Sequence, residues 1–283
     1  MIKKVLKVSL VGRTNAGKST LLNNLLGETV SIVNKKINTT QDLIIGIKNY
    51  KNCQFIFYDT PGVNYLKSIK KNNKKLKINL WQGIDESEII LFIIDSKNIR
   101  FSYIKDQLLK LIELHKEIII IFNKIDLISK DSLLPIIKLI KEELNLVNCF
   151  LISAKYQYGF DHLLKFIKKF SKKNKWIFTK DEVSDKDDIF MTNECTRNSM
   201  LKYLHKEIPY NVIIKNNIFK YLKNGDLKIK QHIFINENRY KKIILGKKGE
   251  KIKLIRENSQ KQISKILNVK THLYLMVIKF NAK

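Results

Sequence analysis

The chain has 283 residues, with 54 Lys and Arg against 26 Asp and Glu, so its formal net charge is +28. A hydrophobic content of 44% is ordinary for a globular protein and excludes a disordered tail protein or a fibre. No apolar run approaches the ~20 residues that cross a bilayer, and Lys7 and Arg13 interrupt the N-terminal stretch, so we expect neither a membrane span nor secretion. Cys53, Cys149 and Cys195 lack metal-ligand spacing and indicate reduced thiols in a cytosol-like compartment.

Basic residues are unevenly distributed along the chain. Lys outnumbers Arg by 49 to 5, and Lys, Ile and Asn have A/T-rich codons, so a biased genome accounts for part of the charge. Residues 201–283 nevertheless carry 20 basic and 5 acidic groups, a net charge of +15, while residues 1–200 carry the remaining +13. The C-terminal part is more than twice as charge-dense, which indicates a polyanionic partner such as nucleic acid or an anionic membrane surface.

Residues 1–172 alternate between strand-like and helix-like segments. Continuous apolar runs predict buried strands at 7–11, 43–50, 54–58, 89–94, 117–122 and 147–152, with helices at 18–26, 101–114, 133–144 and 161–170. Only three residues separate the second and third strands, so these two form an antiparallel hairpin. The pattern predicts an α/β fold with a doubly wound, mostly parallel sheet and one antiparallel edge strand. The lysine run 67–77 is interpreted as a solvated face.

A polar, acidic stretch at 179–188 suggests a boundary, so we expect a first domain at 1–172, a linker at 173–195 and a second domain at 196–283. The second domain is predicted to be a small α+β unit. Its expected elements are helices at 197–206, before and after Gly246–Gly249 and near 260–267, and strands at 212–215, 227–235 and 272–280.

A phosphate-binding loop is predicted between the first strand and the first helix. Gly12-Arg-Thr-Asn-Ala-Gly-Lys-Ser19 matches the pattern G-x-x-x-x-G-K-[ST] in the required context. In such a loop, backbone N–H groups surround the phosphates, the lysine reaches the β- and γ-phosphates, and the final hydroxyl ligates Mg²⁺. The predicted nucleotide-binding residues are Gly12, Asn15, Ala16, Gly17, Lys18, Ser19 and Thr20.

Two further segments predict a magnesium and γ-phosphate site. Asp59-Thr-Pro-Gly62 follows the strand at 54–58, where the carboxylate can hold Mg²⁺ through water and the Gly62 N–H can contact the γ-phosphate. In Asn38-Thr-Thr-Gln41, a threonine can give its hydroxyl to Mg²⁺ when GTP is bound, and we choose Thr40 before Thr39. The predicted catalytic residues are Lys18, Thr40, Asp59 and Gly62, and the predicted metal ligands are Ser19, Thr40 and Asp59.

The ends of the next two strands predict guanine selectivity. In Asn123-Lys-Ile-Asp126, the carboxylate can accept two hydrogen bonds from guanine that adenine cannot offer. Ser153-Ala-Lys155 follows the next strand and can pack against the base. The predicted base-binding residues are Asn123, Lys124, Asp126, Ser153, Ala154 and Lys155.

Gly246-Lys-Lys-Gly249 predicts a nucleic-acid clamp in the second domain. Two glycines at a turn between helices let a nucleic-acid backbone approach closely, and such a turn clamps about four nucleotides. The alternative, a plain helix–turn–helix, stays open at this point. The predicted RNA-binding residues are Gly246, Lys247, Lys248, Gly249, Lys251 and Lys253.

Together these motifs resemble the Era family of bacterial ribosome-associated GTPases, which join a TRAFAC-class P-loop G domain to a C-terminal type II KH domain. The resemblance spans nearly the whole chain and includes Glu207-Ile-Pro-Tyr210 and the stretch Ile244–Lys253. It implies GTP hydrolysis to GDP and phosphate with Mg²⁺, coupled to binding the 3′ end of 16S rRNA during assembly of the small ribosomal subunit. It also implies a monomeric, cytoplasmic protein of a bacterium or an organelle, and the excess of Lys over Arg indicates an A/T-rich genome.

Two further residues fit the resemblance, and two features depart from it. Val63 stands where Era-like proteins have a hydrophobic residue instead of a catalytic glutamine, which implies slow intrinsic hydrolysis. Asn15 matches an asparagine that helps to bind K⁺ in related GTPases, where the ion can act in place of an arginine finger. Gln41 replaces the usual arginine after the threonine pair. The chain also stops almost directly after its last predicted strand, without the short extension of many Era proteins.

Two alternatives to the GTP-driven RNA-binding switch stay open. In the first, the chain is an RNA-binding assembly scaffold with nucleotide-gated docking and negligible turnover. In the second, it is a peripheral-membrane GTPase whose lysines contact anionic lipid. The phosphate, magnesium and guanine motifs favour the enzyme.

Overall fold

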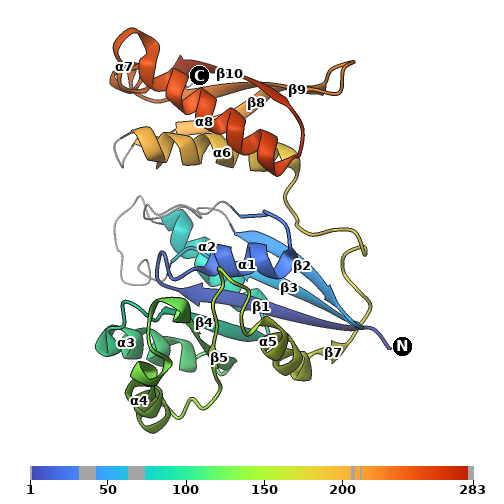
Figure 1. The fold of residues 1–283 in the computed structure, drawn as a ribbon, viewed down its shortest axis with the longest axis vertical. Coiled ribbons are helices and arrows are strands. Elements are labelled where there is room, and N and C mark those ends of the chain that lie inside the picture. The colour runs from blue at the N-terminus through green and yellow to red at the C-terminus, as the bar shows by residue number, and fades with distance from the viewer. Residues whose placement is uncertain (1, 32–42, 63–73, 205–207, 211, 280–283) are drawn as a thin grey trace. The chain divides into compact units, whose positions relative to one another are not determined.

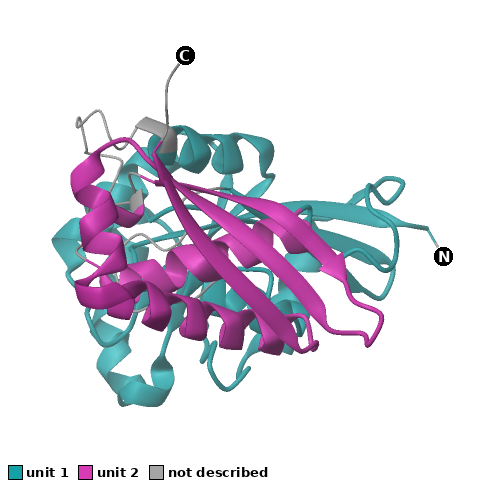
Figure 2. Cartoon of the chain, turned by 90° about the horizontal axis from the view of Figure 1, so that it is seen from above, with its two compact units in different colours: residues 1–185 teal, residues 186–283 magenta. Residues whose placement is uncertain are grey.

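A computed structural model describes residues 2–31, 43–62, 74–204, 208–210 and 212–279. The chain forms two compact units, residues 1–185 and 186–283, which Figure 2 shows in different colours. The second unit begins with helix α6 (Asp188–Tyr203), which covers part of the segment expected to be a linker at 173–195. Asp187 starts this helix as its N-cap, since its carboxylate accepts a hydrogen bond from the N–H of Phe190 at 2.7 Å.

The described part of the first unit contains a seven-stranded sheet in the order β2-β3-β1-β4-β5-β6, with β7 paired to β1. The strands are β1 (Lys4–Gly12), β2 (Ile44–Tyr50), β3 (Cys53–Asp59), β4 (Ile89–Asp95), β5 (Glu117–Asn123), β6 (Cys149–Leu151) and β7 (Lys172–Lys173). Strands β1, β3, β4, β5 and β6 pair in parallel, whereas β2 pairs antiparallel with β3. The predicted doubly wound sheet with an antiparallel edge hairpin is therefore confirmed. The two-residue strand β7, also antiparallel, was not predicted.

Helices cover both faces of this sheet (Figure 1). They are α1 (Lys18–Leu26), α2 (Lys74–Glu86), α3 (Phe101–Ile112), α4 (Leu134–Leu144) and α5 (Phe160–Ile167). Helices α2, α3 and α4 bury apolar side chains in one cluster with β4 and β5, which includes Phe92 and Phe122. Because the strands are apolar on both faces, the sheet is a rigid platform whose strand ends can hold a site.

Helix α2 was missed by the sequence analysis, which interpreted residues 67–77 as a solvated lysine face. Residues 67–73 lie outside the described residues, but the helix begins at Lys74. Leu76, Leu80 and Ile84 recur every four residues and are buried, so they form the apolar stripe of an amphipathic helix. This stripe was the signal that the surrounding lysines concealed.

The segment after β7 runs along the exposed edge of β2. The N–H of Ile47 donates to the carbonyl of Val183 at 2.9 Å, and the Ser184 hydroxyl donates to the carbonyl of Ile45 at 2.8 Å. The N–H of Ile45 also donates to the Asp185 carboxylate at 2.9 Å. These bonds satisfy backbone groups of an edge strand and attach the segment to the first unit.

The second unit is a three-stranded sheet, in the order β10-β9-β8, with helices on one face. Its strands are β8 (Val212–Tyr221), β9 (Leu227–Ile235) and β10 (Thr271–Lys279), and its other helices are α7 (Asn238–Leu245) and α8 (Glu250–Ile266). Strand β10 is parallel to β9, while β8 is antiparallel to it. This α+β unit agrees with the prediction for residues 196–283 in its strand and helix order.

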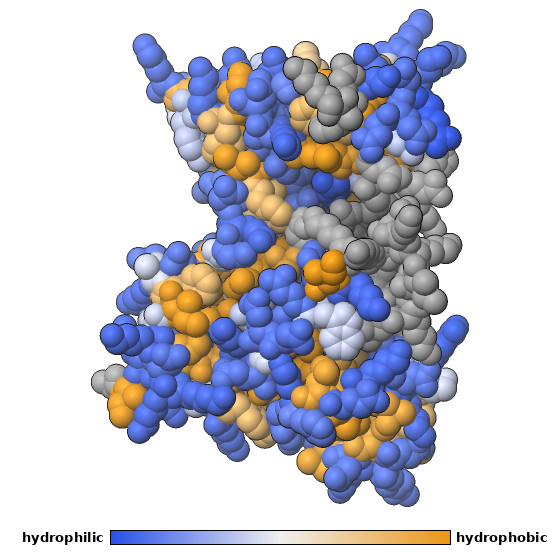
Figure 3. Space-filling model, turned by 180° about the vertical axis from the view of Figure 1, so that it is seen from behind, coloured by the Kyte–Doolittle hydropathy of each residue, from blue (hydrophilic) through white to orange (hydrophobic). Residues whose placement is uncertain are grey.

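The separate helix expected near 260–267 is wrong, because α8 is continuous from Glu250 to Ile266. Ile255, Ser259 and Ile263 are buried at a spacing of four, so one helical face faces the core along the whole length. Figure 3 shows mainly hydrophilic side chains over the face of the molecule that it presents, in keeping with the high lysine content. None of the helices in the described ranges is both long and apolar enough to span a membrane.

Candidate nucleotide and RNA sites

The predicted nucleotide-binding motifs meet at the carboxyl ends of the parallel strands. The P-loop follows β1, Asp59 ends β3, Asn123 ends β5, and Ser153 lies just beyond β6. Gly17 shows why the loop needs glycine, because its φ is +100° and an added Cβ would collide with the Asn123 side chain. An added Cβ at Gly62 would lie 2.7 Å from the backbone nitrogen of Thr14, so Gly62 packs directly on the P-loop.

Lys18, Ser19 and Asp59 form a buried polar cluster below the loop. The Lys18 ammonium donates to the carbonyls of Gly12 and Arg13 at 3.1 Å each. The Ser19 hydroxyl donates to Asp59 Oδ2 at 2.6 Å. Burial lowers the pKa of Lys18 to about 8 against the attraction of Asp59, and burial raises the pKa of Asp59 against the attraction of Lys18. Both charges are therefore held in an environment that disfavours them without further counter-charges.

This cluster fits a nucleotide phosphate together with Mg²⁺. Asp59 is fully buried, and its Oδ1 has no hydrogen-bond partner among the described residues. A carboxylate beside a hydroxyl is the oxygen donor set that Mg²⁺ uses in phosphate sites. A divalent cation would offset the burial of the Asp59 charge, and phosphate oxygens would do the same for Lys18.

Ser31 and Asn23 complete the support of Asp59, and sequence reasoning missed both. The Ser31 hydroxyl donates to Asp59 Oδ2 at 2.8 Å. Asn23 on α1 accepts hydrogen bonds from the N–H groups of Val30 and Ser31 at 3.0 Å each, which fixes the end of that segment. No local motif marks either residue, because both act through contacts that only the folded chain creates.

Asn123 connects three motifs from a fully buried position. Its amide nitrogen donates to the carbonyl of Ala16 at 2.8 Å, and its amide oxygen accepts from the N–H of Ala154 at 2.9 Å. The Ser153 hydroxyl donates to the Asp126 carboxylate at 2.5 Å. The two predicted base-binding motifs therefore hold one another, with Asn123 bonded to both the P-loop and Ala154 and the Asp126 carboxylate bonded to Ser153.

Lys124 attaches the base-binding motif to the P-loop. Its ammonium donates to the carbonyl of Asn15 at 2.7 Å and pairs with Asp95 at 2.8 Å. Asp95 also accepts from Asn98 and from the N–H of Lys97. Burial raises the pKa of Asp95, but the Lys124 ammonium and these two bonds outweigh it, so the pKa is lowered. Asp95 ends β4 and was not predicted as a site residue, although its place at a strand end beside the P-loop was a usable signal.

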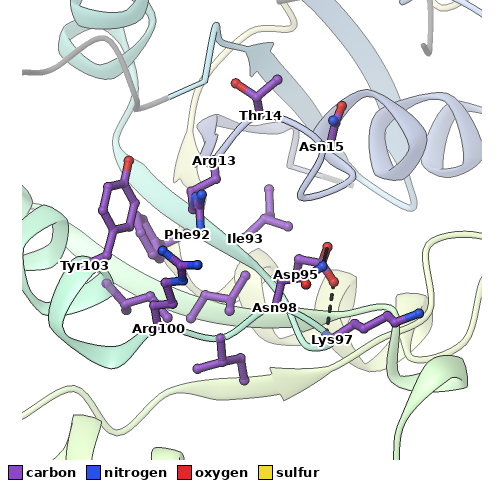
Figure 4. Close-up of a pocket in the computed structure, with 13 residues that line it drawn as sticks. Arg13, Thr14, Asn15, Phe92, Ile93, Asp95, Lys97, Asn98, Arg100 and Tyr103 are labelled. Atoms are coloured by element: carbon purple, nitrogen blue, oxygen red, sulfur yellow. Dashed lines mark hydrogen bonds between the residues drawn. The ribbon is translucent and has the colours of Figure 1, made fainter. Parts of the chain in front are cut away.

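Figure 4 shows a pocket on the β4 side of the P-loop, with a volume of about 530 Å³. The P-loop contributes Arg13, Thr14 and Asn15 to its wall, and the rest comes from β4, residues 97–100 and the start of α3. The Arg13 guanidinium lies over the Tyr103 ring, 4.8 Å from its centroid. Arg13 thus packs the P-loop against α3.

Other residues of the prediction either lie outside the described residues or are at least partly exposed. Thr40, with Thr39, Gln41 and Val63, lies outside the described residues. Thr20 is half-buried on α1, directly after Ser19. Lys155 is exposed, and its ammonium lies over the Tyr156 ring, 4.6 Å from the centroid. Within the described ranges, no group of three His, Cys, Asp or Glu side chains could hold a metal ion.

The predicted RNA-binding loop is a tight turn between α7 and α8. Gly246 has a φ of +69°, and an added Cβ would lie 2.8 Å from Lys251 Cγ and 3.1 Å from its backbone nitrogen. Gly249 has a φ of +82° with open space around its Cα. Lys247, Lys248 and Lys253 are exposed, and Lys251 is half-buried against Gly246. A ligand could therefore approach the backbone of the turn closely, and three lysine side chains lie in solvent beside it.

The fold and the nucleotide site define a P-loop GTPase with a C-terminal KH domain. A family model described as 50S ribosome-binding GTPase matches residues 7–124, and a KH-domain model matches residues 207–281. GTPase Era of Agrobacterium fabrum is 34% identical over 95% of this chain and 84% of the relative. GTPase Era of Rickettsia prowazekii is 35% identical over 98% of this chain and 92% of the relative. The chain belongs to the Era GTPase family, and it is a GTP hydrolase.

Two solved structures resemble the whole chain. A crystal structure of Era in complex with MgGDPNP and nucleotides 1506–1542 of 16S ribosomal RNA has a TM-score of 0.84 and 32% identity, covering 98% of this chain and 94% of that one. A crystal structure of a variant of Aquifex aeolicus Era bound to GDP.AlF4⁻ has a TM-score of 0.86 and 31% identity, covering 99% of this chain and 94% of that one.

Proposed function

We propose that this GTPase binds the 3′ end of 16S rRNA through its KH domain and acts in assembly of the small ribosomal subunit, with the bound nucleotide controlling RNA binding. The observation that carries the proposal is the joint presence of two sites in one chain. The first unit holds the buried Lys18–Ser19–Asp59 cluster, and the second presents the Gly246–Gly249 turn with its lysines. The related Era that binds 16S rRNA matches both units over nearly their full length.

In the nucleotide site, we assign Lys18 to the β- and γ-phosphates, with Gly12, Asn15, Ala16, Gly17, Ser19 and Thr20 around them. Ser19, Asp59 and Thr40 are assigned to Mg²⁺, which supplies electrostatic stabilisation of the charge that develops on the transferred phosphoryl group. The Gly62 N–H is assigned to the γ-phosphate, and Asn15 is assigned to K⁺. With Val63 unable to orient a water molecule, intrinsic turnover is slow.

Guanine recognition is assigned to the two linked motifs at the ends of β5 and β6. Asp126 accepts hydrogen bonds from N1–H and N2–H of guanine, and the Ser153 hydroxyl holds the carboxylate in the orientation that this requires. Ala154 and Lys155 flank the base, and Lys124 keeps the motif in contact with the P-loop.

The RNA contact is assigned to the turn between α7 and α8. Gly246 and Gly249 let a nucleotide backbone approach, while Lys247, Lys248, Lys251 and Lys253 neutralise its phosphates. Crosslinking of the full chain to total RNA tests this assignment with a matched pair of variants. Gly246→Asp with Gly249→Asp should remove crosslinks to the rRNA 3′ end. Gly27→Asp should keep them, because Gly27 has a similar φ of +82° and open space, but lies at the end of α1 in the first unit. Retained 3′-end crosslinks in the double variant would contradict the assignment.

Phosphate release with and without small ribosomal subunits tests the enzymatic part of the proposal. We expect slow release from the protein alone and faster release with subunits, in K⁺ more than in Na⁺. No release in either case would support a scaffold with negligible turnover. Binding to anionic liposomes that RNA does not displace would support a peripheral-membrane GTPase instead of a monomeric cytoplasmic one.

A further inference from the structure

The strands of the second unit present a face that the helices do not cover. Along β9, the odd-numbered residues from Leu227 to Ile235 are buried, while the even-numbered ones are half-exposed. Two of the buried residues, Ile233 and Ile235, pack in one cluster with Tyr240, Ile244 and Ile255 of α7 and α8. In Figure 2 the three strands lie in front of the helices of their own unit. The even-numbered side chains of β9 therefore point away from the helices.

Pairing register identifies the neighbours of these side chains on the uncovered face. One end is apolar, with Ile213, Phe234 and Ile278 aligned across the sheet. The other end is basic, with Lys220, Lys228 and His272 aligned in the same way. The two rows between them mix both kinds of side chain: Lys215, His232 and Met276 in one, and Ile218, Lys230 and Tyr274 in the other.

The composition of this face, which we call the outer sheet face, is unusual for a solvated surface. None of the twelve positions is acidic, and the three strands contain no Asp or Glu at all. Asp226, in the turn before β9, pairs with the Lys270 ammonium at 3.6 Å, which offsets its charge, and it lies 2.7 Å from His272 Nε2. Large apolar groups are exposed, since Tyr274 has 53% and Met276 46% of its surface accessible. The Lys228 ammonium lies over the Tyr274 ring, 5.9 Å from its centroid. A positive and partly aromatic sheet favours a ligand that carries both phosphates and flat rings.

We propose that the outer sheet face is a second RNA-binding surface, which takes a single-stranded segment with its bases on Tyr274 and Phe234 and its phosphates on Lys228 and Lys230. The inference rests on the proposed function, because it concerns the same RNA partner. Single-stranded nucleic acid combines stacking on aromatic side chains with neutralisation by lysine, and exposed sheets supply both. The absence of carboxylates from the strands leaves little on the face that would repel a polyanion.

This surface is separate from the turn at Gly246–Gly249. The turn joins α7 to α8, and both helices pack against the opposite face of the sheet. A strand of RNA held by the turn, which accommodates about four nucleotides, would have to pass a sheet edge to reach Tyr274. The two surfaces together would therefore bind a longer RNA than the turn alone.

The test uses the full chain and a 4-thiouridine-labelled RNA corresponding to nucleotides 1506–1542 of 16S rRNA. Tyr274→Ala leaves charge unchanged and should weaken affinity about tenfold, the effect expected for one lost stacking contact. Lys228→Ala with Lys230→Ala should weaken it further and reduce the salt dependence. Lys261→Ala with Lys265→Ala, which removes the same charge from the exposed side of α8, is the matched control and should have a small effect.

Photocrosslinked peptides are then mapped by mass spectrometry, and crosslinks in β9 and β10 support the proposal. Equal affinities of the wild type and Tyr274→Ala would overturn it, as would crosslinks confined to α7 and α8. These outcomes are distinct from failure of the proposed function, in which the wild type itself would not bind the RNA. The substituted side chains point away from the core, so thermal unfolding should be unchanged in every variant.

Discussion

Binding of Mg·GDP should make the protein take up a proton at Lys18. Without nucleotide, burial lowers the pKa of Lys18 from 10.5 to about 8, although Asp59 opposes the shift. Its ammonium is held only 3.1 Å from two carbonyl oxygens of the P-loop, where the phosphates are expected to bind. Phosphate charge close to the ammonium favours its protonated form, so the pKa should return towards 10.5.

The size of the effect follows from this pKa. If the pKa moves from about 8 to near 10.5, binding takes up about 0.1 proton at pH 7, about 0.5 at pH 8 and about 0.9 at pH 9. The same shift corresponds to ~3 kcal/mol. Because the folded-state pKa is lowered, this cost to folding is present below pH 8 and fades as the pH rises from 8 towards 10.5. The nucleotide-free protein should gain stability over that window.

Isothermal titration in buffers of different ionisation enthalpy measures the proton uptake directly. Lys18→Arg is the matched control, since a guanidinium stays charged at all three pH values. Titration of the guanine base contributes equally to the proton uptake of the wild type and of Lys18→Arg, so it cancels in the difference between the two proteins. A wild-type uptake that stays flat from pH 7 to pH 9, or equals that of Lys18→Arg, would refute the argument that burial governs Lys18.

Three further predictions concern single side chains. Asp126→Asn should weaken binding of GTP relative to xanthosine triphosphate on the order of 1000-fold, and unchanged competition between the two would contradict the guanine assignment. Asp59→Asn should lower turnover on the order of 100-fold. An unchanged Mg²⁺ dependence of turnover in Asp59→Asn would count against the metal assignment. Leu80→Ala in α2 should lower the free energy of unfolding by about 2–5 kcal/mol in urea titrations, because Leu80 is fully buried. A loss below about 1 kcal/mol would contradict the packing of α2 in the core.

The strands and helices with a clear period were predictable from sequence. Helix α1 at Lys18–Leu26 and strand β9 at Leu227–Ile235 have the bounds that their patterns predicted. Helix α2 was missed because lysines surround its buried stripe, Leu76, Leu80 and Ile84. Helix α8 was divided in two because its middle is polar, and only the packed structure reveals that Ser259 is buried.

The candidate site was predictable where a residue belongs to a motif with its own spacing. Lys18, Asp59 and Asn123 were found in this way, because each stands at a fixed distance from glycines or strand ends. Ser31 and Asp95 were not, since each matters through one partner far away in sequence: Asp59 for Ser31 and Lys124 for Asp95. Such pairs have no period or local signature that a single sequence could display.

The central claim is that nucleotide state controls RNA binding by this GTPase. Its most direct test is the affinity of the full chain for an RNA corresponding to nucleotides 1506–1542 of 16S rRNA, measured with Mg·GDP and with a non-hydrolysable Mg·GTP analogue. The account predicts that the chain binds this RNA with different affinities in the GDP-bound and GTP-analogue-bound states. In Asp126→Asn, which should bind guanine nucleotides weakly, adding either nucleotide should no longer change the affinity for RNA. Equal affinities in both states, with both nucleotides at saturation, would contradict it.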